Sequence, residues 1–214
     1  MSIDRLNALK AENDSAGLEM MTEAGRFAAL ANRNNNGLAP RAITAFNLFQ
    51  TPEAVAHRMV SMIPETMRHT YILEPSAGLG RLYNAIRERF SMSEYTLIEN
   101  NPDCMKELYS LTEVHRLTRL IQKDFLTFEA KKAYNVIIMN PPFKMGRDVK
   151  HIKHAAEMLT PGGILVSLCY NGVKQNRDLK PLCDTWEVLP EGSFKSEGTR
   201  AEVVLLTIKE PVNA

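Results

Sequence analysis

The sequence predicts an α/β protein with a doubly wound, mostly parallel sheet of seven strands and helices on both faces. From about residue 70, short apolar runs alternate with segments of helical periodicity. Such alternation implies parallel strands joined by crossover helices. The last two apolar runs, 186–189 and 202–208, have no helix between them. We therefore expect the last strand to be antiparallel.

The elements follow in order along the chain. Residues 2–33 are rich in helix-forming residues with apolar side chains at helical spacing, and an Asn- and Gly-rich break follows at 32–37. We expect a helical N-terminal appendage over 1–40 and the main domain over 41–214. Its strands are expected at 71–73, 95–98, 120–122, 134–139, 164–168, 186–189 and 202–208, and its helices at 80–90, 102–111, 147–159 and 174–183.

Composition narrows the class of protein. The chain has 214 residues, of which 44% are hydrophobic, and a formal net charge of +1, so a globular domain with a real core is expected and bulk charge does not decide the partner. The scattered cysteines Cys104, Cys169 and Cys183 indicate reduced thiols. The charged N-terminus lacks a secretion signal, and no apolar run approaches the roughly 18 residues of a membrane span. We expect a cytoplasmic protein with no membrane segment.

A loop with two glycines follows the first strand. It reads Glu74-Pro75-Ser76-Ala77-Gly78-Leu79-Gly80, and glycines at the carboxyl end of a parallel strand permit a tight turn and the close approach of a ligand. A plain glycine turn is the alternative, because Tyr83 stands where a dinucleotide-binding fingerprint has its third glycine. The candidate cofactor-binding residues here are Glu74, Ser76, Ala77, Gly78 and Gly80.

Acidic residues follow the next two strands, at the same expected edge of the sheet. Glu99 lies about 20 residues beyond the glycines, where a carboxylate can accept hydrogen bonds from both hydroxyls of a ribose, and Asn100 stands beside it. Asp124 can accept from an adenine amino group while Phe125 covers the ring. Either acid alone would be an ordinary residue of a surface turn, so the inference depends on their combination.

The strand 134–139 ends in Asn140-Pro141-Pro142-Phe143. The prolines stiffen the turn, remove two N–H donors and push Asn140 towards extended geometry. The side-chain oxygen of Asn140 and the carbonyls of Asn140 and Pro141 are then fixed acceptors. They can hold both hydrogens of an amino group conjugated to a ring and direct its lone pair at an electrophile, while Phe143 stacks on the ring. A strand end terminated by prolines is the alternative.

Together these motifs resemble the class I S-adenosylmethionine-dependent methyltransferases, and within them the amino-methyltransferases that act on adenine N6 of DNA. The resemblance covers about residues 44–208. It implies a Rossmann-like fold, S-adenosylmethionine as the cofactor and DNA as the substrate. The tetrapeptide from Asn140 to Phe143, including Pro141 and Pro142, corresponds to the catalytic NPPF/Y sequence of that family.

The segment Phe49-Gln50-Thr51-Pro52 extends the resemblance. Thr51 as N-cap and Pro52 at the first helical position would make a good helix start, which is also the ordinary interpretation. In the DNA adenine family, an F-x-T-P element lies over the methionine end of the cofactor. The resemblance therefore adds Gln50, Thr51, Pro52 and Asn140 to the candidate cofactor contacts.

The segment after the tetrapeptide is basic. Positions 147, 150, 151 and 154 fall on one face of the expected helix. That face can contact phosphates beside a base pocket or be an ordinary solvated face. The candidate DNA contacts are Lys144, Arg147, Lys150, His151 and His154, with Lys195 and Arg200 in the last loop. No Cys or acid nearby completes a metal site with the two histidines, so no metal is expected.

The separate target-recognition domain of that family has no room between Phe143 and the next strand, so relaxed sequence specificity is expected. Three alternatives stay open. The same tetrapeptide occurs in methyltransferases for RNA bases and for protein glutamine, and a catalytically silent nucleic-acid-binding subunit is a rival of another class. The sequence does not give the target site, the purpose of the methylation or the oligomeric state.

Overall fold

The computed structural model describes residues 49–67 and 70–212, all within the unit that runs from Ala45 to Ala214. The expected helical appendage over 1–40 lies outside the described residues. The strands are β1 (Tyr71–Glu74), β2 (Glu94–Glu99), β3 (Thr118–Gln122), β4 (Tyr134–Met139), β5 (Leu159–Tyr170), β6 (Thr185–Val188) and β7 (Val203–Lys209). The α-helices are α3 (Glu53–Ser61), α4 (Arg81–Arg89), α5 (Pro102–Thr112), α6 (Arg147–Ala156) and α7 (Val173–Asp178), and the 3-10 helices are η1 (Phe125–Thr127), η2 (Lys144–Gly146), η3 (Lys180–Leu182) and η4 (Lys195–Glu197).

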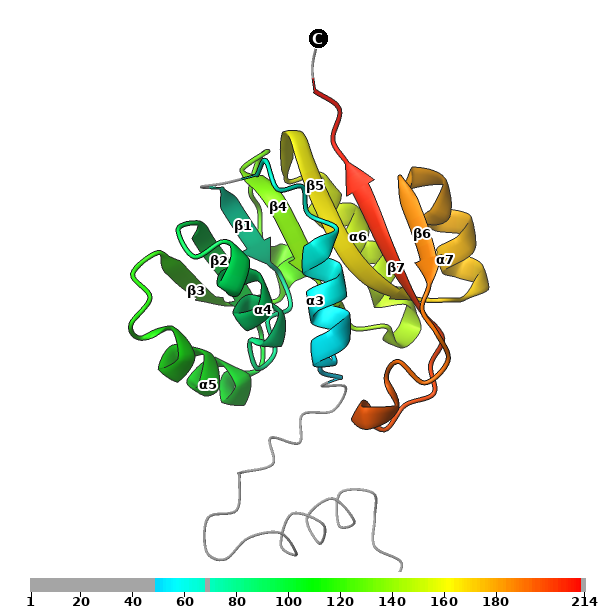
Figure 1. The fold of residues 1–214 in the computed structure, drawn as a ribbon, viewed down its shortest axis with the longest axis horizontal. Helices are drawn as coiled ribbons and strands as arrows, with labels where there is room; N and C mark the ends of the chain where they lie inside the picture. The colour runs from blue at the N-terminus through cyan, green and yellow to red at the C-terminus, as the bar shows by residue number, and fades with distance from the viewer. Residues whose placement is uncertain (1–48, 68–69, 213–214) are drawn as a thin grey trace, which may run out of the picture. The chain divides into compact units, whose positions relative to one another are not determined.

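The seven strands form one sheet in the order β3-β2-β1-β4-β5-β7-β6 (Figure 1). The strands β1 to β5 are parallel, and β7 lies antiparallel between β5 and β6. The expected fold class is therefore confirmed, including the antiparallel last strand. The order of the strands reverses between β1 and β4, and in such sheets ligands bind at the carboxyl ends beside this reversal.

Both faces of the sheet are buried at its central strands, which explains why strands such as β4 are nearly continuous apolar runs. Ile72 of β1 and Val136 of β4 belong to the core cluster that includes residues of α3, α4 and α5. Their chain neighbours Leu73 and Ile137 belong to the cluster that includes residues of α6. This alternation follows the two-residue period of a strand. Figure 1 shows α3, α4 and α5 on the near face of the sheet and α6 behind it.

The boundary between α6 and β5 differs from the expectation. Helix α6 ends at Ala156 rather than at residue 159, and β5 begins at Leu159 rather than at 164. Leu159 pairs with Tyr134 before the register shifts, after which Ile164 pairs with Val136. A bulge absorbs the intervening Thr-Pro-Gly-Gly, since proline cannot donate to the ladder and Gly162 takes a φ of +76°. The Thr-Pro-Gly-Gly sequence, which predicts the end of a helix, therefore lies inside strand β5.

The start of α3 also differs from the expectation. Pro52 occupies the N-cap position instead of the first helical position, and its carbonyl accepts from Ala56 N at 2.9 Å. Thr51 forms no cap hydrogen bond and is buried. A residue before proline is disfavoured in helical geometry, and Thr51 lies one residue outside the cap position. None of the helices in the described part of the chain is long and apolar enough to cross a membrane.

Candidate functional site

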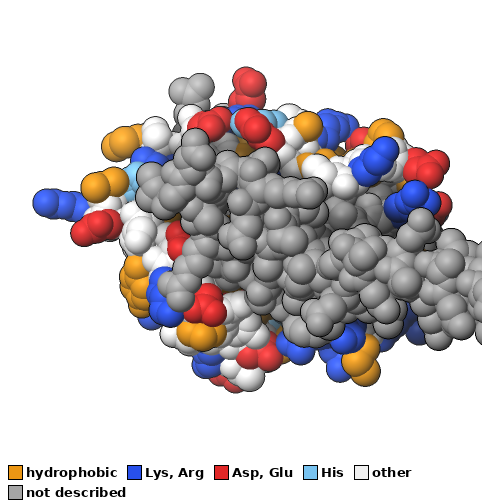
Figure 2. Space-filling view, turned by 90° about the horizontal axis from the view of Figure 1, so that it is seen from below, with side chains coloured by type: hydrophobic (Ala, Val, Ile, Leu, Met, Phe, Trp, Pro, Cys, Tyr) orange, Lys and Arg blue, Asp and Glu red, His pale blue; other side chains and the backbone are white. Residues whose placement is uncertain are grey.

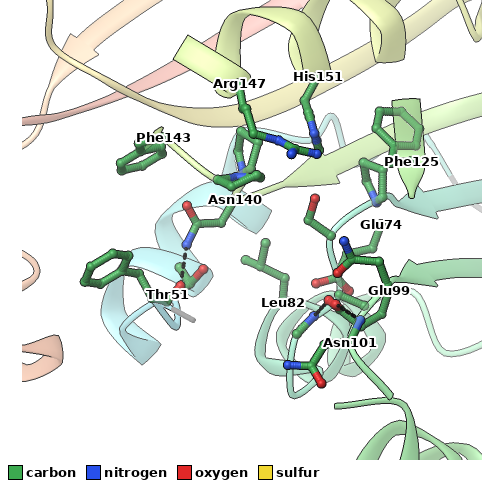
Figure 3. A pocket seen from close by; sticks show the side chains of 18 of the residues that line it. Thr51, Glu74, Leu82, Glu99, Asn101, Phe125, Asn140, Phe143, Arg147 and His151 are labelled. Atoms are coloured by element: carbon green, nitrogen blue, oxygen red, sulfur yellow. Dashed lines mark hydrogen bonds between the residues drawn. The ribbon is translucent and has the colours of Figure 1, made fainter. Parts of the chain in front are cut away.

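A cavity of about 430 Å³ opens at the carboxyl ends of β1, β2 and β4, beside the reversal of strand order (Figure 3). Its walls come from the loops after these strands, from the loop after β3 and from the segment before α3. Eleven of the thirteen expected cofactor-binding residues line it; they are Gln50, Thr51, Glu74, Ser76, Ala77, Gly78, Glu99, Asn100, Asp124, Phe125 and Asn140. Pro52 and Gly80 do not line it.

Gly80 supports the loop instead of lining the cavity. It has a φ of +77° and its N–H donates to Ala77 O at 2.8 Å. A Cβ at this position would lie 2.5 Å from the side chain of Leu111 on α5 and 3.1 Å from that of Leu108. Glycine is therefore needed both for the left-handed backbone and for the close packing of the start of α4 on α5.

Glu99 connects the two loops on its side of the cavity. One carboxylate oxygen accepts from Gly78 N at 2.8 Å, and the other accepts from Asn101 N at 2.8 Å. These bonds fix the carboxylate at the end of β2 (Figure 3). Each oxygen keeps a further lone pair for a ligand, so Glu99 can accept from two vicinal hydroxyls without leaving its backbone partners.

Glu74, at the end of β1, is the most isolated acid of the cavity. Its side chain is 2% exposed, and its Oε2 has no hydrogen-bond partner among the described residues. Burial raises the pKa of this carboxyl well above its usual range, and the nearby charge of Glu99 raises it further. A buried carboxylate with an unpaired oxygen is costly unless something pairs with it. A cationic or hydrogen-donating ligand group in the cavity would supply that partner.

Asp124 and Phe125 form the wall after β3. The Asp124 carboxylate accepts from Leu126 N at 3.0 Å and from an Nη of Arg147 at 3.2 Å. Phe125 is buried, and its ring centroid lies 5.5 Å from that of His151 and 4.9 Å from that of His154. Helix α6 thus turns its Arg and His side chains towards this loop.

This orientation corrects the expected phosphate-binding face of α6. His151 is 4% exposed, and His154 pairs through Nε2 with the carbonyl of Phe128 at 2.8 Å. His151 is buried and His154 is half-buried, and both pack against the Phe125 ring. Lys150, Lys195 and Arg200 are exposed but do not line the cavity, whereas Lys144, Arg147 and His151 do.

His151 has an unusual environment. Neither ring nitrogen has a hydrogen-bond partner among the described residues. Burial, with a smaller contribution from the charge of Arg147, lowers the pKa of His151 to about 4. The imidazole is therefore neutral near pH 7 and presents one donor and one acceptor at the cavity wall.

Asn140 carries the geometry that matters most for chemistry. Its Nδ2 donates to the carbonyl of Phe49 at 3.1 Å, which fixes the amide with Oδ1 on the other side. In Figure 3 that oxygen lies on the side towards Phe143, while the nitrogen faces the segment that carries Thr51. Pro141 is buried, Pro142 is half-buried, and Phe143 is half-buried against the core cluster beneath α3.

Arg81 lines the cavity but was not among the site residues predicted from the sequence. Its Nε donates to Gln50 Oε1 at 2.6 Å, and an Nη lies 3.9 Å from Glu197 in the loop between β6 and β7. Arg81 thereby connects the segment before α3 to the last loop at the cavity. Its position directly after the glycine loop was the available signal. The other lining residues that were missed are Phe49, Pro75, Leu79, Leu82, Asn101, Lys123 and Met145.

The charges around this edge are mixed. Figure 2 views the molecule from below, the side towards which the parallel strands of Figure 1 point. Among the described side chains that are visible around the rim of that view, both Lys and Arg and Asp and Glu are present. No group of three or more His, Cys, Asp or Glu residues in the described ranges could hold a metal ion.

Residues 52–195 match the sequence profile of the family described as methyltransferase small domain. This chain belongs to that family. Methyl transfer is therefore its activity, and S-adenosylmethionine is the methyl donor. No curated protein matches the sequence.

Solved structures agree on the fold. A type I restriction-modification methyltransferase subunit from Streptococcus thermophilus superposes with a TM-score of 0.66 at 16% identity, over 78% of this chain and 46% of that one. This methyltransferase thus spans about half the length of that subunit. An RNA methyltransferase from Salinibacter ruber in complex with S-adenosylhomocysteine gives 0.55 at 19% identity, over 77% and 95%. A putative RNA methyltransferase from Pyrococcus horikoshii gives 0.61 at 15% identity, over 87% and 99%.

Proposed function

We propose that this methyltransferase transfers a methyl group to the exocyclic N6 amino group of adenine in DNA. The observation that carries the proposal is the fixed amide of Asn140. Because the Phe49 carbonyl takes a hydrogen of the amide nitrogen, Oδ1 is left to accept a hydrogen from a substrate amino group. A fixed acceptor at the mouth of a cofactor cavity suits an acceptor nitrogen that must be held and aimed.

The chemistry then depends on positioning. S-adenosylmethionine supplies a methyl group on a positively charged sulfur. Asn140 Oδ1 and the Pro141 carbonyl each accept one hydrogen of the adenine amino group, which turns the nitrogen lone pair away from the ring and towards the methyl carbon. Phe143 stacks on the base. The same acceptors stabilise the positive charge that develops on the nitrogen, and a proton leaves to solvent after transfer.

The cavity walls fit the cofactor. Glu99 has spare lone pairs for both ribose hydroxyls, and Asp124 can exchange its 3.2 Å contact with Arg147 for the adenine amino group. The unpaired oxygen of Glu74 suits the cationic methionine end. Gly78, with a φ of +53°, lets the backbone approach closely. The 430 Å³ cavity lies within the range that small-molecule sites occupy.

One observation favours DNA over RNA or protein. The segment Phe49–Thr51, which belongs to the F-x-T-P element of the DNA adenine family, lines the cavity and holds Asn140 in place. The solved structures with the same fold do not separate DNA from RNA, since they include a type I restriction-modification methyltransferase subunit and an RNA methyltransferase. The exposed Lys144, Lys150, Lys195 and Arg200 are the remaining candidates for phosphate contacts. Phosphate contacts position without specifying, so we expect relaxed sequence context.

The test is methyl transfer from labelled S-adenosylmethionine to DNA, RNA and protein offered separately. We expect label in N6-methyladenine of DNA. Asn140→Ala should lower the turnover number about a hundredfold, as loss of one preorganised polar group does elsewhere. Asn84→Ala, at an exposed asparagine of α4, is the matched control and should match the wild type.

The identity of the labelled acceptor decides between the proposed substrate and the alternatives. Label only in RNA bases or only in protein glutamine would keep the methyltransferase and overturn the substrate. No transfer to any acceptor, together with intact cofactor binding, would favour a silent binding subunit. Mapping N6-methyladenine on a treated plasmid tests context, since a single methylated site of four or more defined bases would contradict relaxed specificity.

A further inference from the structure

Met145 lies in the loop after β4 with its side chain almost fully in solvent. It is 88% exposed, and it takes a φ of +58° and a ψ of +26°. Left-handed backbone is unfavourable for a residue with a long side chain, and strained residues of this kind cluster at functional sites. An exposed hydrophobic residue by itself needs no explanation. An exposed hydrophobic residue held in strained backbone does.

The turn alone does not account for methionine at this position. Gly146, the next residue, also has a positive φ of +67° and adopts it without strain. A Cβ on Gly146 would lie 2.9 Å from Nζ of Lys174, so the lysine side chain crosses its backbone. If only the turn mattered, glycine or asparagine at position 145 would form it at lower cost. The side chain of Met145 is therefore the feature to explain.

The surroundings of Met145 are those of a nucleic-acid contact at the catalytic edge. It follows Phe143 by two residues, and both line the cavity. Two residues of extended chain span at most about 7 Å, so Met145 lies within about one nucleotide of the base-stacking ring. Lys144 precedes it, and the side chain of Lys174 on α7 lies against the backbone of the next residue, Gly146. An apolar side chain with lysines beside it can contact stacked bases while the lysines contact the flanking phosphates.

We propose that Met145 is a wedge that enters the base stack of duplex DNA and fills the space left by the adenine that Phe143 receives. The proposal rests on the proposed function, since it requires an adenine to leave a duplex. Methionine is among the apolar side chains that proteins insert between base steps. The strain is consistent with this role, because it fixes the side chain outward before DNA arrives.

The test compares duplex with single-stranded substrate. The duplex contains one A·T pair among G·C pairs, and the single strand is its adenine-containing strand. An unpaired base need not be extruded, so a wedge matters only for the duplex. We expect Met145→Ala and Met145→Gly to lower the duplex-to-single-strand ratio of methylation rates about tenfold, and Met145→Leu to preserve it.

Met92→Ala is the matched control. Met92 is 65% exposed and precedes β2, at the opposite edge of the sheet, so both rates should stay at wild-type values. A C opposite the target adenine should restore most of the loss in Met145→Ala, because a mispaired base leaves the stack more easily. An unchanged ratio, or equal losses on both substrates, would overturn the wedge. A wild-type enzyme that methylates neither substrate would instead overturn the proposed function.

Discussion

Two buried carboxylates, Glu74 and Asp148, lie on opposite sides of the sheet core and differ in what surrounds them. Burial raises the pKa of both. Asp148, on α6, is completely buried and accepts from Val149 N, Tyr170 N and the Gln175 amide at 2.9–3.1 Å. Glu74 has one oxygen with no partner among the described residues. A buried acid with four hydrogen bonds belongs to the fold, and one with an unpaired oxygen points to a ligand.

The positions of the two acids agree with this difference. Asp148 joins α6 to the end of β5 and to α7, where every partner is a protein group. Glu74 ends β1 at the cavity that it lines. Substitution of Asp148 should therefore change stability, and substitution of Glu74 should change cofactor affinity. The predictions below test that separation.

The largest effect is expected at Asp148. Asp148→Ala leaves the buried Gln175 amide and the partly buried Tyr170 N–H without their acceptor, and each unsatisfied buried group costs about 1–3 kcal/mol. We expect the free energy of unfolding to fall by about 3 kcal/mol or more in urea titrations. Asp103→Ala, at an acid whose side chain is 60% exposed, should change it by less than about 1 kcal/mol. A cofactor-affinity loss in Asp148→Ala without a stability loss would break the comparison.

The fold could be predicted from sequence because its signals are local. Each expected apolar run overlaps a strand of the sheet, and the run 134–139 is one of those at the centre of the sheet. The missing crossover before 202–208 was enough to predict the antiparallel last strand. The early start of β5 was not predictable, because proline and two glycines read as a stop unless the partner strand that supports the bulge is known.

The site was predictable where residue type alone sets the chemistry. Glu99 and Asn140 could be placed because the ends of parallel strands converge at one edge. The direction in which a side chain points could not be predicted in this way. Helical spacing put His151 and His154 on one face with Arg147 but did not show that the face turns towards Phe125. The strain at Met145 was also invisible, since backbone angles in a short turn depend on the packing around it.

His151 shares one property with each acid. Its ring nitrogens lack a hydrogen-bond partner among the described residues, as Glu74 Oε2 does, and its substitution should change stability, as that of Asp148 should. Its pKa is lowered to about 4 in the folded protein, against about 6.5 when unfolded. Between these values the unfolded state binds more protons, so stability should fall as the pH drops through this window and be independent of His151 above it. From pH 8 to pH 5 the loss should be roughly 2 kcal/mol.

His151→Phe should remove that part of the pH dependence while retaining a ring against Phe125. Urea titrations of both proteins at pH 8, 6.5 and 5 measure it, and the difference cancels other titrating groups such as Glu74. If the free energy of unfolding depended equally on pH in the two proteins, the histidine would be hydrated or paired. His151 would then not be one of the polar groups of the cavity that lack a hydrogen-bond partner.

The smallest effect, and the sharpest test of the comparison, is Glu74→Gln. The amide keeps the shape but removes the charge that a cationic ligand group would meet, so S-adenosylmethionine affinity measured by calorimetry should fall about tenfold, near the lower bound for a charge-assisted hydrogen bond. Stability near neutral pH should rise or stay unchanged, because the cost of burying an ionised carboxyl disappears. A stability loss with unchanged affinity would make Glu74 a structural acid like Asp148.

The same titration locates the cation that Glu74 faces. S-adenosylmethionine has a sulfonium and an ammonium group, whereas S-adenosylhomocysteine retains only the ammonium. Equal affinity losses for both in Glu74→Gln would place the carboxylate at the ammonium, and a loss for S-adenosylmethionine alone would place it at the sulfur. Because the folded pKa of Glu74 is raised, wild-type affinity should weaken as the pH falls through that raised pKa, where the carboxyl gains a proton. Glu74→Gln should lack this dependence, and its persistence in the variant would assign the titration to another group.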